Sequence, residues 1–358
     1  MKFTNDAKST IETFAKHTVS GFRAFGNPES VDVERFPTRV RGRFPSLDGL
    51  RAVAILLVIQ SHLAGGRYIL PGWGTGHFPL RFAYGHLGVR IFFVISGFLI
   101  TTLLLQEHDK QGRISLKQFY IRRALRILPA SYVFMLVLII LAGMGVLSIP
   151  LNSFLASFLY VRNYFGGGDW YTGHLWSLSV EEQFYLIWPA AMVSLGRRRA
   201  VVVAFCTLPA ACLLRFTRPY FGFETNMDGL ACGCILACLW GWLGRNEGYQ
   251  RFLRSRLFWV LPSAILASVA LVRYEGTFIA ITGITLTNIL IAASLERFVR
   301  YHRLSAANLL NSRLAVYLGT LSYSLYLWQQ LWIVRKRTPF PFWPWRASSV
   351  KIGSWRMS

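Results

Sequence analysis

The sequence predicts an all-α protein, a polytopic bundle of about nine to ten transmembrane helices. Of its 358 residues, 53% are hydrophobic and only 15% are charged. The mean hydropathy of +0.39 is too apolar for an ordinary soluble domain. Apolar segments recur from near residue 50 to residue 334 without a long polar insert. We therefore expect one membrane domain over residues 46–334, a cytoplasmic tail over residues 1–45 and an atypical basic tail over residues 335–358.

The apolar segments place candidate spans along this whole domain. By hydropathy they cover residues 49–64, 87–106, 127–147, 183–196, 200–216, 228–244, 258–274, 277–295 and 315–334. A further apolar piece, Phe154 to Tyr164, is about eleven residues long, which is too short to cross a bilayer comfortably. We expect this piece to be re-entrant or interfacial.

The net charge of +23 raises the question of nucleic-acid binding. The basic residues lie in short loops between apolar segments, however, and no nucleic-acid motif accompanies them, which is typical of charge that sets membrane orientation. The main clusters are Lys110 to Arg126, Arg197 to Arg199, Arg245 to Arg256 and Arg297 to Arg313. With the N-terminus inside, all four lie inside only if residues 154–164 do not cross, and we predict this topology.

The two ends of the chain and the cysteines add three expectations. Residues 1–45 contain no apolar run behind their charges, so no cleavable signal peptide is predicted. Nine spans would leave the basic residues 335–358 outside, against the charge rule, and one missing final span would remove this conflict. The five cysteines lie in apolar stretches without paired metal-binding spacing, so no metal site is predicted.

An apolar helix over residues 48–62 begins with an acid and a base and holds a histidine near its far end. Arg51 and His62 are eleven residues apart, about three turns, and so share one stripe roughly 16 Å apart along the axis. Asp48 can pair with Arg51 three residues later. Ionisable groups in a membrane helix are expected to face the bundle interior. The alternative is that Asp48 and Arg51 mark the water interface and that His62 is a packing residue.

Three arginines, Arg122, Arg123 and Arg126, open the predicted span near residue 127, on the inner face. The guanidinium group presents a planar fork of donors that suits phosphate oxygens. Because these residues lie within about one turn of a helix, they form a patch that can hold a nucleotide or coenzyme phosphate. The alternative, which the charge pattern alone favours, is anchoring by the positive-inside rule.

A second polar cluster just before an apolar run comprises His174, Trp176, Ser177, Ser179, Glu181 and Glu182. Ser179 with Glu182 fits a capping box, which alone would explain both residues. Ser177 and Glu181 are not explained in this way, and they share a helical face if the helix begins earlier. His174 adds a proton carrier and Trp176 a flat apolar wall. The cluster holds more polar groups than capping requires, which favours a functional role.

Asp228 and a stripe of small residues open the span predicted over residues 228–244. We interpret Asp228 as a helix cap. Gly229, Gly233 and Ala237 recur at four-residue spacing, which is the usual device for close packing between membrane helices. We therefore assign this stretch to structure rather than chemistry.

Taken together, five strings resemble the acyltransferase 3 family of bacterial membrane O-acyltransferases. They are Leu47 to Ala54 with His62, Gly88 to Thr101, Arg122 to Pro129, His174 to Pro189, and Leu321 to Trp328. Each string alone is a weak signal, but five in the family's order are specific.

The resemblance implies that an acyl group, often acetyl, moves from cytoplasmic acyl-CoA to a hydroxyl of a cell-envelope or exported carbohydrate. The protein would then lie in the bacterial inner membrane and use acyl-CoA as its donor substrate, with no permanently bound cofactor. No nucleic-acid partner is expected. By the resemblance, Arg51 and His62 form the arginine-to-histidine pair, with His62 as the essential catalytic histidine. Arg123 and Arg126 match the donor-binding double-arginine motif, and Ser177 and Glu181 match a serine-to-glutamate motif.

The predicted site follows from these motifs and from the polar clusters. The catalytic candidates are His62, Arg51 and Glu181, and the substrate-binding candidates are Arg122, Arg123, Arg126, Asp48, His174, Trp176, Ser177 and Glu182. One alternative is a transporter or flippase of a lipid-linked sugar, for which internal repeats and broken spans would be expected. Another is an inactive, truncated member of the family, because many members have one more span after the last string.

Overall fold

The computed structural model describes residues 36–40, 42–64, 78–165, 169–218, 221–270 and 278–333. Within these residues the regular structure is helical, apart from one antiparallel bridge between Val40 and Arg43, which confirms the all-α class. The longer helices are α2 (Leu47–Ala64), α3 (Phe78–Gln111), α4 (Leu116–Gly143), α7 (Leu175–Leu214), α8 (Phe223–Arg245), α10 (Val260–Ala270), α11 (Phe278–Arg300) and α13 (Arg313–Trp332). Short helices join them: α5 (Leu151–Phe158), α6 (Trp170–Gly173), α9 (Glu247–Arg254), η2 (Arg256–Trp259) and α12 (Ser305–Leu310).

Three helices in the described part of the chain are long and apolar enough to cross a membrane. They are Tyr84–Gln111 within α3, Leu116–Gly143 and Phe223–Arg245. The remaining spans stay predictions, and their boundaries differ from the helices. The predicted spans 183–196 and 200–216 join in α7, which is bent at Gly196, where φ is +71°. Glycine suits that bend because it adopts positive φ without a Cβ clash.

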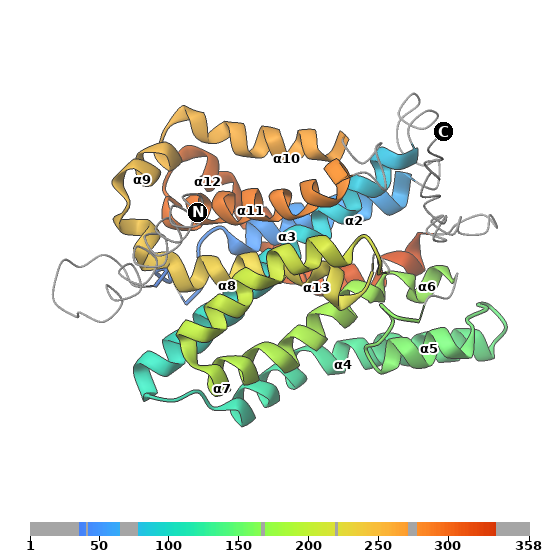
Figure 1. The fold of residues 1–358 in the computed structure, drawn as a ribbon. Helices are drawn as coiled ribbons and strands as arrows, with labels where there is room; N and C mark the ends of the chain where they lie inside the picture. The colour runs from blue at the N-terminus through green and yellow to red at the C-terminus, as the bar shows by residue number, and fades with distance from the viewer. Residues whose placement is uncertain are drawn as a thin grey trace, which may run out of the picture. The chain divides into compact units, whose positions relative to one another are not determined.

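The centre of the bundle is α3, which packs against α2 on one side and α8 on the other, while α7 packs on α8 and α13 on α2 (Figure 1). The α3–α8 crossing is close because both helices lack side chains there. A Cβ atom added to Gly97 would overlap the Leu230 carbonyl oxygen, and one added to Gly233 would overlap the backbone of Val94. The prediction that Gly233 serves close packing is confirmed.

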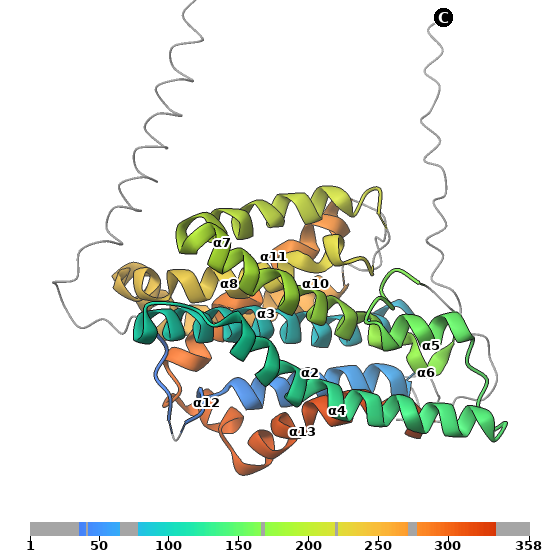
Figure 2. The same cartoon turned by 90° about the horizontal axis from the view of Figure 1, so that it is seen from below.

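The helix ends gather at two ends of the bundle (Figures 1 and 2). At one end α3 meets α4, α7 bends at Gly196, α8 meets α9 and α11 meets α12. All four basic clusters of the sequence fall at these junctions, and we call this end the basic end. The other end holds the last residues of α2 and α13 together with α5 and α6, and we call it the histidine end because His62 lies there.

The short helix α5 explains why the basic clusters share one end. It has eight residues and is about 12 Å long, far less than the ~30 Å of a bilayer core. The chain therefore enters the histidine end through α4, forms α5 and α6 there, and leaves through α7 (Figure 2). The helix α5 therefore stays at one end of the bundle, and the side of the membrane on which each end lies remains a prediction.

Candidate functional site

The first turn of α2 carries an ion pair at the basic end. Arg51 donates to Asp48 Oδ1 at 3.3 Å, and Arg43 lies 3.7 Å from Asp48 Oδ2. The side chains of Arg51 and Asp48 are only 18% and 16% exposed. The predicted pairing within the helix is confirmed. Arg51 also interacts electrostatically with Arg123 and Arg126 of α4.

Glu181 of α7 lies in the middle of the bundle, facing α3. Ser96 donates to Glu181 Oε1 at 2.8 Å, and Tyr185 donates to Ser96 Oγ at 3.1 Å. The Arg123 guanidinium lies 4.9 Å from the centre of the Tyr185 ring, and both Arg51 and Arg123 interact electrostatically with Glu181. The carboxylate therefore connects the arginines of α2 and α4 to a line of hydroxyls on α3 and α7.

The three arginines of α4 line one cleft. Its volume is about 360 Å³, and it is lined by Leu103, Leu104, Glu107, Phe119, Arg122, Arg123 and Arg126. Arg122 pairs with Glu107 at 3.0 Å and is 57% exposed. A cleft with guanidinium donors beside leucine and phenylalanine side chains suits a ligand that carries both phosphate and an apolar arm.

His62 lies near the end of α2, half-buried at the histidine end. Its Nδ1 lies 3.1 Å from Gln329 Oε1, and its Nε2 lies 3.2 Å from Gln330 Nε2. The Trp170 ring meets it edge-on, with the ring centres 5.7 Å apart. These neighbours are polar or aromatic, and an imidazole in such surroundings can exchange a proton.

His174 and Ser177 lie at the start of α7, packed against α13. Ser177 Oγ and the Tyr326 hydroxyl are 2.5 Å apart, and Tyr326 donates to the His174 carbonyl oxygen at 2.6 Å. His174 Nε2 lies 3.2 Å from the Leu327 carbonyl oxygen. These contacts tie the first turn of α7 to the same stretch of α13 that contacts His62.

Trp176 joins a cluster of aromatic rings. Its ring centre lies 4.7 Å from that of Phe221, 6.0 Å from His86 and 6.2 Å from Phe93. His86 also interacts electrostatically with His62. His86 and Phe221 were not predicted as site residues. The sequence marks each of them only as an aromatic residue at the margin of an apolar segment.

The capping-box interpretation of Ser179 and Glu182 is wrong. The helix begins earlier, at Leu175, so both residues lie inside α7. Ser179 donates to the Leu175 carbonyl oxygen at 3.0 Å and accepts from the Arg162 backbone N–H at 3.2 Å. Glu182 Oε1 is buried without a hydrogen-bond partner among the described residues. The earlier start does place Ser177 and Glu181 on one face, as the sequence allowed.

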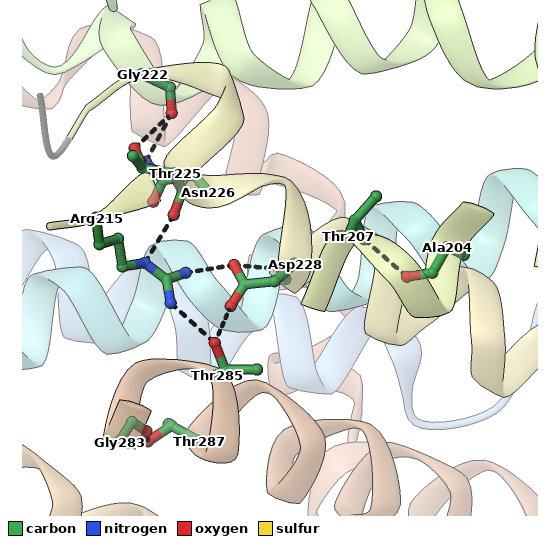
Figure 3. A network of polar contacts seen from close by, with 11 residues as sticks. Ala204, Thr207, Arg215, Gly222, Thr225, Asn226, Asp228, Gly283, Thr285 and Thr287 are labelled. Carbon is green, nitrogen blue, oxygen red and sulfur yellow. Dashed lines mark hydrogen bonds and ion pairs between the residues drawn. The ribbon is translucent and has the colours of Figure 1, made fainter. Parts of the chain in front are cut away.

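The interpretation of Asp228 as a cap is also wrong. The N-cap of α8 is Gly222, and Asp228 is a fully buried partner of Arg215 at 2.5 Å (Figure 3). Thr285 of α11 donates to Asp228 Oδ2 at 2.7 Å and accepts from Arg215 at 2.8 Å. Arg215 also donates to the Thr225 carbonyl oxygen at 2.9 Å. The Arg215–Asp228 pair and Thr285 join α7, α8 and α11. Asp228 therefore has a structural role, as predicted, but through an ion pair and not through a helix cap.

The predicted residues form two groups in the structure. Arg51 and His62 are about 16 Å apart along α2, because eleven residues of continuous helix separate them. Asp48, the α4 arginines and Glu181 belong with Arg51, whereas His174 and Ser177 belong with the α13 residues around His62. Within the described residues no cluster of three or more His, Cys, Asp or Glu is placed to hold a metal ion.

Comparisons with known proteins agree with these motifs. The family model described as an acyltransferase domain matches residues 44–352. Peptidoglycan O-acetyltransferase OatA of Listeria monocytogenes is 30% identical over 331 residues, which is 79% of this chain and 48% of OatA. No solved structure matches.

Two further relatives extend the comparison. SACOL0978 of Staphylococcus aureus (strain COL), provisionally named an O-acetyltransferase, is 32% identical over 79% of this chain and 50% of its own length. YrhL of Bacillus subtilis (strain 168), provisionally named a peptidoglycan O-acetyltransferase, is 30% identical over 79% of this chain and 48% of its own length. The chain spans about half the length of these curated relatives. By the family match over most of its length, the chain belongs to the acyltransferase 3 family of membrane acyltransferases.

Proposed function

We propose that the protein is an O-acetyltransferase that moves an acetyl group from cytoplasmic acetyl-CoA to a hydroxyl of a cell-envelope carbohydrate, with peptidoglycan as the first acceptor to test. The observation that carries the proposal is the arrangement along α2. One end of this helix carries Arg51, which interacts electrostatically with two of the three arginines that line the cleft, and the other end presents a hydrogen-bonded histidine. Two relatives are named for peptidoglycan, which supports the choice of acceptor.

The arginine cleft is the proposed site of the donor phosphates. Arg123 and Arg126 bind phosphate oxygens from α4, and Arg122 contributes from the exposed rim. Asp48 and Glu181 keep Arg51 and Arg123 in place by balancing part of their charge. The apolar side chains Leu103, Leu104 and Phe119 line the same cleft and would cover the start of the thioester arm. The proposed route of the arm from there is along α2 towards His62.

His62 is the proposed general base. Its Nε2 accepts the proton of the acceptor hydroxyl as that oxygen attacks the thioester carbonyl carbon. The carbon–sulfur bond then breaks, and the proton passes from His62 to the coenzyme thiolate, so His62 ends each cycle neutral. An acetyl-imidazole intermediate on His62 is the covalent version of the same scheme.

The acceptor is proposed to approach at the histidine end. Trp176 provides a flat apolar face for a sugar ring, and Ser177, His174 and Glu182 lie on the same stretch of α7. With the basic end in the cytoplasm, the acceptor side is outside, which matches a bacterial inner-membrane enzyme that acts on envelope glycans. The membrane domain over residues 46–334 then carries the whole reaction.

Radiolabelled acetyl-CoA separates an enzyme from a transporter or a flippase. Membranes that contain the full chain are incubated with the labelled donor and with peptidoglycan fragments. The proposal expects label on the glycan, released by mild base as an ester should be, and no label with the His62→Ala variant at equal protein level. A glycan that stays unlabelled while a lipid-linked sugar crosses the membrane would instead identify a flippase.

A further inference from the structure

Two consecutive residues of α13 contact the same imidazole. Gln329 and Gln330 reach Nδ1 and Nε2 of His62 at 3.1 Å and 3.2 Å. Neighbouring side chains on a helix diverge by about 100°, so both can meet one ring only if the ring is seated between them. Both glutamines are buried, at 6% and 2% exposure. Gln330 Oε1 has no hydrogen-bond partner among the described residues, so the contact with His62 is made by the Gln330 Nε2 atom.

The orientation of the Gln329 amide follows from its second contact. Gln329 Nε2 donates to the Tyr326 carbonyl oxygen at 3.3 Å, so Oε1 is the atom that faces His62. An amide oxygen can only accept, and His62 Nδ1 therefore carries the proton. In a neutral imidazole this leaves the lone pair on Nε2.

Gln330 completes the arrangement from the other side. Its Nε2 is a donor only, and the lone pair that Gln329 leaves on His62 Nε2 is the acceptor that it needs. The Gln330 backbone carbonyl oxygen also accepts from Trp170 Nε1 at 2.9 Å, which fixes this residue against α6. Its amide thus occupies the position from which a hydroxyl would donate its proton to Nε2.

We propose that Gln329 and Gln330 are the positioning residues of His62. Gln329 selects the tautomer in which Nε2 is the basic nitrogen, and Gln330 holds Nε2 until the acceptor hydroxyl displaces its amide. This inference rests on the proposed function, because it assigns a role to these residues in the reaction of His62.

The charges around His62 set the background for a pH test. From α3, His86 interacts with His62 and has Arg90 beside it. From the start of α7, His174 interacts with His62 and is in turn influenced by Arg162. The α13 contacts are the two neutral amides. The substitutions in α13 therefore change the hydrogen bonds of the ring without removing any of these charged or titratable groups.

Gln329→Met and Gln330→Met should move the pH profile of kcat/KM in opposite directions. Activity is lost as the pH falls and His62 becomes protonated. Gln329 accepts from Nδ1, which is protonated in both forms of His62, and this hydrogen bond is stronger in the cation. Its loss should therefore lower the pKa of His62 and move the acidic limb to lower pH. Gln330 donates to the lone pair on Nε2, and this hydrogen bond exists only in neutral His62. Its loss should therefore raise the pKa of His62 and move the acidic limb to higher pH. Gln329→Glu, which faces Nδ1 with a carboxylate, should also move it to higher pH.

The assay uses membranes with the full chain, with Gln111→Met at the exposed end of α3 as the matched control. We expect each methionine variant to lower kcat about tenfold or more, at equal protein level, while the KM for acetyl-CoA stays within about twofold of the original. Tenfold corresponds to about 1.4 kcal/mol. The glutamate variant should keep more activity than Gln329→Met at high pH.

Two outcomes would overturn a claim. If both methionine variants lose activity without any shift of the limb, or with shifts of the same sign, the glutamines only pack against His62 and the inference is wrong. If the chain labels glycan but His62→Ala is as active as the original, the proposed base is wrong and the inference falls with it. If a methionine variant is too unstable to accumulate, Gln329→Leu or Gln330→Leu also removes the amide and provides the same comparison.

Discussion

The two ends of α2 hold their polar groups in different ways. At the basic end the arginines outnumber the carboxylates within reach, and Arg122 is 57% exposed beside Glu107. At the histidine end the ion pairs are matched and buried, with side-chain exposures of 4% and 3% for Arg162 and Asp169 and of 3% and 0% for Arg215 and Asp228. His62 there is held by neutral amides.

The difference teaches which end is available to an anion. Excess positive charge in an open cleft attracts phosphate, whereas a buried pair that is already neutralised has no further charge to offer. A histidine among neutral hydrogen-bonding groups is suited to moving a proton rather than to binding an anion. The comparison predicts four effects of decreasing size.

The largest effect should come from His62→Ala. A positioned general base typically contributes 10²–10⁴-fold to a rate, so we expect acetyl transfer to fall by about that factor. Donor binding, measured by equilibrium dialysis of labelled acetyl-CoA against the purified protein, should stay unchanged because the arginine cleft lies at the other end. Acetyl transfer above one tenth of the original rate would contradict the assignment of proton transfer to the histidine end.

Asp228→Ala should destabilise the histidine end without entering the reaction. It leaves the Arg215 guanidinium buried without its carboxylate (Figure 3), and removing one partner of a buried ion pair typically costs about 3–5 kcal/mol. The measurement is the free energy of unfolding in detergent, by denaturant titration. Glu247→Ala is the matched control, because its pair with Arg251 is exposed. Equal stability of the two variants would contradict the structural role.

Arg123→Gln combined with Arg126→Gln should weaken donor binding. A charged hydrogen bond contributes about 1.5–3 kcal/mol, so we expect the KM for acetyl-CoA to rise about 10- to 100-fold at similar kcat. Arg198→Gln with Arg199→Gln, which are exposed at the α7 bend, removes the same charge outside the cleft. If that control raises the KM for acetyl-CoA equally, the KM depends on the total positive charge at this end of the protein, and the cleft is not the donor site.

The smallest effect should come from Arg122→Gln. Its ion pair with Glu107 is mostly exposed, and exposed pairs contribute about 0–1 kcal/mol. We expect less than about a threefold rise in the KM for acetyl-CoA. A rise as large as that of the Arg123 and Arg126 variant would move the centre of the donor site to the rim of the cleft.

Features that depend on local pattern could be predicted from the sequence. The Asp48–Arg51 pair, the Gly233 packing and the shared end of the basic clusters follow from helical spacing and from loop charge. The start of α7 was predicted wrongly. Ser179 lies inside the helix and accepts from the Arg162 backbone N–H, a contact that the local pattern does not show.

The partners of the buried polar residues could not be predicted. Arg215 finds Asp228 and Thr285 only when three helices pack together. The glutamines that contact His62 are more than 260 positions away from it in the chain. No periodicity connects such residues. The distance between Arg51 and His62 follows from helical spacing, but the partners of each residue are visible only in the folded chain.

The continuity of α2 has a mechanical consequence. Arg51 and His62 lie on one continuous helix, so the distance between them is fixed and cannot adapt to the donor. Each inserted residue would lengthen the helix by 1.5 Å and turn the imidazole by about 100° away from α13. An insertion in α2 would therefore change both the distance from Arg51 to the imidazole and the direction in which the imidazole points. An acyl donor of fixed length would then no longer reach the ring in the right orientation.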